Sequence, residues 1–212
     1  MAAFTLSPPI VVLKPAMNEN MAWVDLAHSG GGPMAVELVV YERRVNLDGD
    51  VETANMKRSA DFSVYPAQLI MRPGDRGRAQ VVYKSRKKVT ADMAYFLSAK
   101  EVQLPIEEEV EGIKTGVTMT TDYYSVIAFE TGKPAKLTFV SSKEIGNGMI
   151  EVVAVNKGNG RAIVENMVLT VNGERITNFT GKKNSVMPGQ SRRFTFTYKR
   201  AVTAKEIKFG GK

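Results

Sequence analysis

The sequence predicts an all-β protein made of two tandem β-sandwiches, and three observations support this class. Helical periodicity is almost absent from the 212 residues. Short runs rich in Val, Ile, Thr, Phe and Tyr are bounded by Gly, Pro, Asn and Asp, which is the pattern of strands and turns. Two blocks of sequence also repeat further along the chain. About a dozen short strands with regular turns are what two sandwiches require.

The repeat indicates two homologous units. The first block is a Pro-Gly turn followed by an alternating strand: Pro73, Gly74, Arg78 and Tyr83 recur, shifted by 115 positions, as Pro188, Gly189, Arg193 and Tyr198. The second block recurs with a shift of 128 positions: Met21, Val24, Gly30, Gly32, Val36 and Glu37 correspond to Met149, Val152, Gly158, Gly160, Val164 and Glu165. Two different shifts point to loops of different length between the blocks, not to a short-period solenoid.

The expected strands follow from the apolar and β-branched runs. In chain order they are 4–13, 21–27, 34–43, 61–71, 77–83, 93–102, 116–129, 135–140, 149–155, 161–171, 175–179, 192–198 and 206–209. Asn172-Gly173 is a strong two-residue hairpin signal. Residues 130–134 lack apolar side chains and contain Gly and Pro, so we expect the hinge there. The predicted domains are therefore 1–131 and 132–212.

Composition limits the class of function. The chain has 43% hydrophobic and 24% charged residues, no cysteine, and no apolar run long enough to span a membrane. Residues 1–131 carry 14 Lys+Arg and 17 Asp+Glu, a net charge of −3, whereas residues 132–212 carry 15 and 5, a net charge of +10. This basic second half is either a docking face for an acidic partner or a set of solvated strand positions. No nucleic-acid motif accompanies it, so we expect no nucleic-acid partner.

The sequence gives little support for a catalytic site. We therefore expect neither an enzyme nor a cofactor or metal site. His28 is the single histidine and lies in a Gly-rich turn, where we interpret it as a surface-turn residue. The sequence contains no nucleophile elbow, no Walker loop, no dinucleotide-binding glycine pattern and no metal-spaced ligand set.

The segment 116–129 differs from the other predicted strands because of its length. Apolar or β-branched side chains at Val117, Met119, Thr121 and Tyr123 alternate with polar ones, and an apolar run follows. At about 3.3 Å per residue the segment would extend about 45 Å, which is longer than a usual strand. Such a strand can project beyond its sheet and offer alternate side chains to another protein. The alternative is an ordinary last strand that packs into its own core.

Six short motifs follow one another along the chain: Phe62–Pro66, Arg72–Gly74, Tyr95–Val102, Val155–Gly160, Val186–Gly189 and Arg192–Phe194. Their order resembles that of the periplasmic pilus-assembly chaperones of the chaperone–usher pathway, especially their divergent "alternate" branch. The resemblance spans nearly the whole chain. It implies two immunoglobulin-like domains in a boomerang arrangement, with the mature protein in the periplasm and its signal peptide absent from this sequence.

The resemblance also implies a mode of action. A pilin, or fimbrial subunit, lacks its last strand, and the chaperone supplies one of its own strands to the open groove before delivery to an outer-membrane usher. Carried over residue by residue, the donor positions are Val117, Met119 and Thr121, with Tyr123 as a fourth. The chain is not expected to be membrane-embedded, and free chaperones are expected to be monomers or to cap each other in dimers.

One family feature is missing. Typical members hold the subunit's terminal carboxylate with an Arg and a Lys, and the matching positions here are Pro8 and Val126. Lys14, Arg43 and Arg44 are the candidates to replace that cleft anchor. Two functional classes thus remain open: a periplasmic subunit chaperone, and a structural pilus or surface sandwich protein that assembles through the same edge strand.

Overall fold

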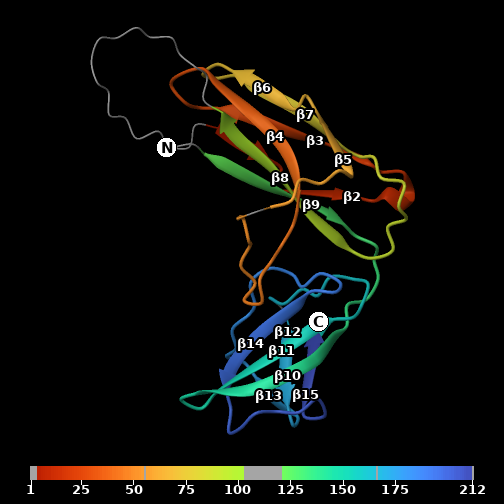
Figure 1. Cartoon of the computed structure of the whole chain (residues 1–212), viewed down its shortest axis with the longest axis vertical. Helices are drawn as coiled ribbons and strands as arrows, with labels where there is room; N and C mark the ends of the chain where they lie inside the picture. The colour runs from red at the N-terminus through yellow and green to blue at the C-terminus, as the bar shows by residue number, and fades with distance from the viewer. Residues whose placement is uncertain (1–3, 55, 103–120, 166, 212) are drawn as a thin grey trace, which may run out of the picture. The chain divides into compact units, whose positions relative to one another are not determined.

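The computed structural model describes residues 4–54, 56–102, 121–165 and 167–211 (Figure 1). Its described residues divide into two compact units, each made of strands. The first unit consists of Met1–Glu42, Lys57–Lys87 and Tyr95–Ala128, and the second of Arg43–Met56, Lys88–Ala94 and Phe129–Lys212. Fifteen strands and one short 3₁₀ helix, η1 (Pro15–Met17), are described, which confirms the all-β prediction.

Two sheets form the first unit. One has the order β1-β3-β7-β5 and the other the order β2-β9-β8-β4-β6. The strands are β1 (Phe4–Ser7), β2 (Ile10–Leu13), β3 (Met21–His28), β4 (Met34–Glu42), β5 (Phe62–Tyr65), β6 (Gln68–Met71), β7 (Arg76–Tyr83), β8 (Met93–Val102) and β9 (Asp122–Phe129). Their inward side chains, among them Val24, Val36, Val81, Leu97 and Ile127, are fully buried. Period-two alternation therefore places one face of each strand in a shared core.

Two of the predicted strands are each divided in the structure. The predicted strand 4–13 is β1 in one sheet and β2 in the other, and the predicted strand 61–71 is likewise β5 and β6. Pro8, Pro9 and Pro66 stand at the two breaks. Proline has no N–H to donate to a strand ladder, so the chain leaves one sheet there and continues in the other.

The second unit is also a sandwich, with sheets β10-β11-β14 and β13-β12-β15. Its strands are β10 (Leu137–Gly146), β11 (Met149–Asn156), β12 (Met167–Val171), β13 (Glu174–Ile176), β14 (Ser191–Thr197) and β15 (Ile207–Gly211). The predicted Asn172-Gly173 hairpin is confirmed: it joins β12 to β13, and both residues have positive φ, 51° and 84°. The predicted strand 161–171 is wrong at residues 161–165, where Ala162 forms only an isolated bridge with Val186.

The sequence repeat is preserved in strand register. In the first unit β3 pairs with β7, with Val24 opposite Ala79. In the second unit β11 pairs with β14, with Val152 opposite Phe194. These two pairs are related by the same shifts of 128 and 115 positions that relate the repeated blocks. The repeat therefore reflects one supersecondary structure built twice.

The equivalence extends to the turn after β3 and after β11. His28 is 5% exposed, donates from Nε2 to Gly32 O (2.7 Å) and accepts at Nδ1 from Gly30 N–H (3.1 Å). Its counterpart Asn156 is fully buried, donates to the carbonyl four residues on (2.8 Å) and accepts from the N–H two residues on (3.0 Å). The prediction of a surface His28 is thus wrong. The ring is buried because it satisfies backbone groups of its own turn.

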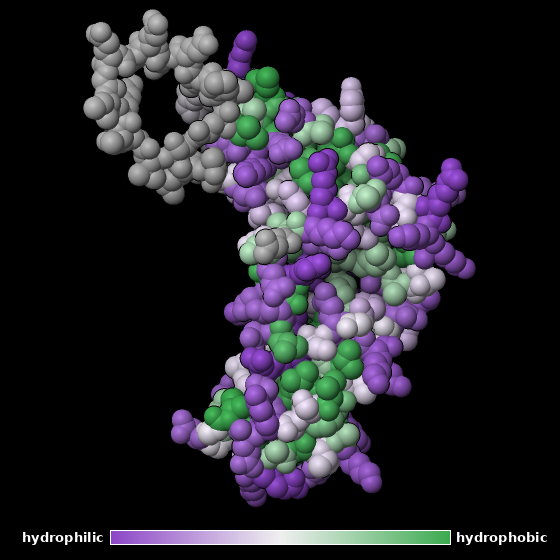
Figure 2. Space-filling view, viewed as in Figure 1, coloured by the Kyte–Doolittle hydropathy of each residue, from purple (hydrophilic) through white to green (hydrophobic). Residues whose placement is uncertain are grey.

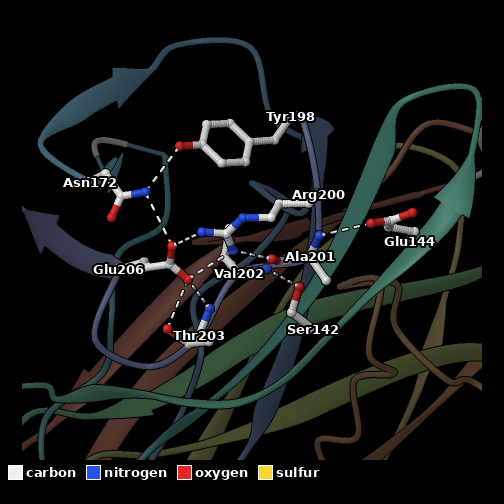
Figure 3. Close-up of polar contacts among 9 residues, drawn as sticks. All are labelled: Ser142, Glu144, Asn172, Tyr198, Arg200, Ala201, Val202, Thr203 and Glu206. Carbon is white, nitrogen blue, oxygen red and sulfur yellow. Dashed lines mark hydrogen bonds and ion pairs between the residues drawn. The ribbon is translucent and has the colours of Figure 1, made fainter.

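A polar cluster closes one end of the second unit (Figure 3). Glu206 accepts hydrogen bonds from Arg200 (2.5 and 3.3 Å), from the N–H and hydroxyl of Thr203 (both 2.8 Å) and from Asn172 (3.3 Å). Asn172 also donates to Tyr198 Oη (3.2 Å). The bond to Arg200, followed by those to Thr203, lowers the pKa of Glu206 from 4.5 to about 2. The cluster therefore ties the β12–β13 turn to the chain between β14 and β15.

Candidate functional site

The predicted donor strand enters the described structure at Thr121 and continues as β9. Val117 and Met119 lie outside the described residues. The carbonyl of Thr121 accepts a hydrogen bond from Glu101 N–H of β8 (3.0 Å), so the chain is already paired with β8 at residue 121. β9 lies between β8 and β2 in the five-stranded sheet. The sheet thus holds the C-terminal half of the predicted 116–129 strand.

The strand beside β9 is short. β2 has four residues whereas β9 has eight, so β2 can cover only part of β9. Ile10 and Val12 on β2 are 55% and 43% exposed, and Tyr124 on β9 is 37% exposed. Exposed apolar side chains beside a partly covered strand edge are features of a surface that accepts another strand.

Tyr123, the fourth predicted donor residue, contacts its own unit. Its ring packs edge-on against the fully buried Phe4 of β1, with centroids 4.9 Å apart. Thr121 and Tyr123 are both partly buried. The contact with Phe4 favours a structural role for Tyr123, whereas the donor role assigned to the four positions stays a prediction.

A polar cluster that sequence reasoning missed fixes the start of β9. Ser98 Oγ on β8 donates to Asp122 Oδ1 (2.7 Å), and Tyr124 Oη donates to Asp122 Oδ2 (2.7 Å). Burial of the ring, together with the hydrogen bond to Asp122, raises the pKa of Tyr124 to about 12. One signal was available in the sequence: Asp is disfavoured inside strands, so an Asp between aromatic and Thr residues calls for a partner.

The positions that match the family's basic anchor lie close together. Ser125 is fully buried and its hydroxyl donates to Pro8 O (2.6 Å), and Val126 N–H donates to Pro9 O (2.9 Å). Backbone and hydroxyl groups therefore join the first segment to β9 at these positions. Neither Pro8 nor Val126 carries a charge that could pair with a carboxylate.

The three candidate replacement cations have different surroundings. Lys14 is in the first unit, where it forms an exposed ion pair with Glu19 (4.0 Å). Arg43 and Arg44 are in the second unit. Burial, and then the nearby charge of Arg192, lower the pKa of Arg43, whereas Arg44 is exposed. No shared site of the three is described, and their anchoring role stays a prediction.

Across the described ranges, no group of three or more His, Asp or Glu side chains is arranged to hold a metal ion. In the same part of the chain, no helix is long and apolar enough to cross a membrane.

Solved structures share this fold over nearly the whole chain. The E. coli chaperone DraB is 15% identical, with 93% of this chain and 86% of that chain covered and a TM-score of 0.58. A chaperone–tip adhesin complex of CFA/I fimbriae biogenesis is 13% identical, with 100% and 99% covered and a TM-score of 0.62. The CsuC–CsuE chaperone–tip adhesion subunit complex of archaic chaperone–usher Csu pili from Acinetobacter baumannii is 16% identical, with 98% and 92% covered and a TM-score of 0.58.

No family model and no curated protein matches the sequence. At these identities the solved structures establish the fold: the chain has the two-domain, immunoglobulin-like fold of fimbrial chaperones. The predicted fold class is thereby confirmed.

Proposed function

We propose that this chain is a periplasmic chaperone that captures pilus or fimbrial subunits by donor-strand complementation and delivers them to an outer-membrane usher. The observation that carries the proposal is β9, a strand that continues the alternating 117–121 segment and is only partly covered by β2. The fold shared with fimbrial chaperones supports it. In this proposal the chain has no catalytic activity and needs no cofactor.

The proposed capture combines two physical effects. Backbone N–H and C=O groups of the 117–121 segment pair with the subunit's open strand edges, and alternate side chains enter its groove. Val117 and Met119 supply the largest apolar surfaces, each worth about 1.5–3 kcal/mol when fully buried. Because the usual anchor positions are Pro8 and Val126, strand pairing and apolar contact carry most of the binding.

The test is co-production with a fimbrial subunit that is insoluble alone. We expect the unchanged chain to keep the subunit soluble in a 1:1 complex. Changing both Val117 and Met119 to Asp should abolish capture, because an unpaired charge buried in an apolar groove costs several kcal/mol. The matched control changes Thr118 and Thr120 to Asp, because these side chains face the other side of an extended strand and should leave capture intact.

Three outcomes would contradict the proposal. Capture that survives the Val117 and Met119 changes would show that another surface binds the subunit. Failure of that variant to fold would place the two side chains in the chain's own core. Polymerisation of the unchanged chain through its edges would instead support a structural pilus or surface protein.

A further inference from the structure

A tight turn of the chain contacts one edge of β14. Residues 43–56 lie between β4 and β5 in the sequence but belong to the second unit. Arg193 N–H of β14 donates to Leu47 O (2.8 Å), and Asn184 Nδ2 donates to Gly49 O (2.8 Å). Residues 46–50, here named the 46–50 segment, form this turn: Asn46 N–H donates to Asp50 O (2.9 Å) and Gly49 N–H donates to Asn46 O (3.1 Å). Two carbonyls of the turn, those of Leu47 and Gly49, are therefore bound by groups of the second unit's sandwich.

Two carboxylates of the 46–50 segment are recognised by separate cations. Asp48 accepts from Arg193 Nη1 at 3.2 and 3.3 Å, and Asp50 accepts from Lys183 Nζ at 2.9 Å. Arg193 also pairs through Nε with Glu151 Oε2 (3.1 Å), which holds its guanidinium on the outer face of the sheet. The two cations are thus placed to bind two acidic residues that lie two positions apart in a sequence.

A glycine is required between the two acids. Arg192 is 1% exposed, and its Nη1 donates to the carbonyls of Gly181, Lys183 and Asn184. Gly49 lies directly against that Nη1 with φ +88°, so a Cβ here would collide with the guanidinium and with Lys183 O. Asp48 and Asp50 also interact electrostatically with the buried Arg192 guanidinium.

The contacts that hold the 46–50 segment are polar and largely exposed. The side chains of Asp48 and Asp50 are 53% and 52% exposed, and that of Lys183 is 69% exposed. The space-filling view shows hydrophilic residues, in purple, over much of the face that it presents (Figure 2). Exposed ion pairs are weak and sensitive to salt, so the segment is held reversibly in comparison with a core strand.

We propose that Lys183, Asn184 and Arg193 form a recognition surface for an acidic peptide of the pattern Asp-Gly-Asp, which the 46–50 segment fills as an intramolecular ligand. An acidic segment of another protein binds the same surface by displacing it. Charge complementarity favours such a partner, because residues 132–212 carry a net charge of +10. This inference does not depend on the proposed chaperone function.

The test uses the whole chain and a labelled synthetic peptide with the sequence of residues 44–52. The variant Asp48→Asn/Asp50→Asn weakens the intramolecular ligand without changing its size. Each exposed ion pair contributes roughly two- to fivefold to an equilibrium constant. We therefore expect the variant to bind the peptide about 4- to 25-fold more tightly than the unchanged chain, as measured by fluorescence anisotropy at low salt.

Two controls make the result specific. A peptide with Asn in place of both Asp residues should bind at least about fivefold more weakly, and adding Arg193→Gln to the double variant should weaken binding of the acidic peptide by a similar factor. Equal binding by the unchanged chain and the double variant, absence of binding by both, or equal binding of the two peptides would overturn the proposal.

A second measurement covers the case in which the double variant does not fold. In the unchanged chain, raising salt from about 0.05 to 0.5 M should speed hydrogen exchange at the Arg193 amide, because the Debye length shortens from about 14 to about 4 Å and the exposed ion pairs that hold the segment are weakened by screening. The neighbouring Phe194, which is fully buried in the core, should keep its protection. An Arg193 amide whose exchange is insensitive to salt would contradict a displaceable segment.

Discussion

The equivalence of His28 and Asn156 leads to a quantitative prediction about the first unit. Replacing His28 with Ala removes two side-chain hydrogen bonds, to Gly32 O and from Gly30 N–H. Each partly buried group left without a partner costs roughly 1–3 kcal/mol, and the small cavity adds to that cost. We expect His28→Ala to lower the free energy of unfolding by about 2–6 kcal/mol.

The variant His28→Asn should recover most of this loss. An Asn at the equivalent place in the second unit already makes the same two bonds, with the same spacing along the chain. We expect a cost of about 0.5–1.5 kcal/mol, mainly from the smaller side-chain volume. Urea unfolding followed by the fluorescence of Trp23 measures it, because this is the chain's single tryptophan and lies on the same strand as His28.

The reciprocal change provides a matched control. Asn156 also accepts from Lys136 N–H (3.0 Å) and donates to Val186 O (2.8 Å), so it makes four side-chain bonds. An imidazole has two nitrogens and cannot replace all four. Asn156→His should therefore destabilise its unit more than His28→Asn destabilises the other. Equal losses for His28→Ala and His28→Asn, or a His28→Ala loss below about 0.5 kcal/mol, would refute the reasoning.

Three further predictions concern charge and domain organisation. The pKa of Glu206 is about 2 in the folded chain and 4.5 for reference, so its stabilising effect is complete above pH 4.5 and disappears as the pH falls towards 2. Glu206→Gln should therefore flatten the pH dependence of urea unfolding between pH 4.5 and 2. An unchanged profile would contradict this. Residues 129–212 expressed alone should be at least about 3 kcal/mol less stable than the same unit in the whole chain. The fragment lacks the 43–56 segment and Asp92, whose carboxylate accepts three hydrogen bonds. Equal urea midpoints for the fragment and the whole chain would contradict this prediction. In a subunit complex, raising salt from about 0.05 to 0.5 M should slow association and leave the dissociation rate nearly unchanged; a dissociation rate that rises more than about fivefold would indicate a charged anchor.

Much of the fold was predictable because it depends on local and repeated patterns. Alternation identified the inward faces correctly: Ala79, Val81, Phe194 and Phe196 are all buried. The Asn172-Gly173 turn followed from the need for two residues of positive φ. The breaks at proline were not placed, because an apolar run alone does not reveal which sheet each half joins.

The position of the domain boundary stays a prediction, but the proposed hinge has defined contacts. Thr131 donates to Asp92 through both its N–H and its hydroxyl (2.7 Å each), and Glu130 pairs with Arg161 (2.7 Å). These partners are far apart in sequence. Composition predicts a linker at 130–134 but cannot show which distant groups bind it.

Arg192 shows why the polar parts of the structure were harder to predict. It continues the alternation of Phe194 and Phe196, so period two places it on the core side of β14. Arginine is seldom fully buried, and where it is, its N–H groups need hydrogen-bond acceptors inside the protein. Those acceptors are carbonyls of residues 181–184, covered by Gly49 from a distant segment. Sequence spacing does not contain that information.

The repeated arginine explains why the two units differ at this edge. In the first unit Arg78 forms a bidentate pair with Asp25 on the adjacent strand (2.6 and 3.3 Å). The repeat places Val153 where Asp25 stands, so the equivalent Arg193 has no acid directly opposite it on β11. Arg193 instead pairs with Glu151 and with Asp48 of the 46–50 segment. With Val153 opposite it, Arg193 pairs with an acid of a segment distant in sequence, Asp48, and this is the interaction that the peptide-displacement experiment measures.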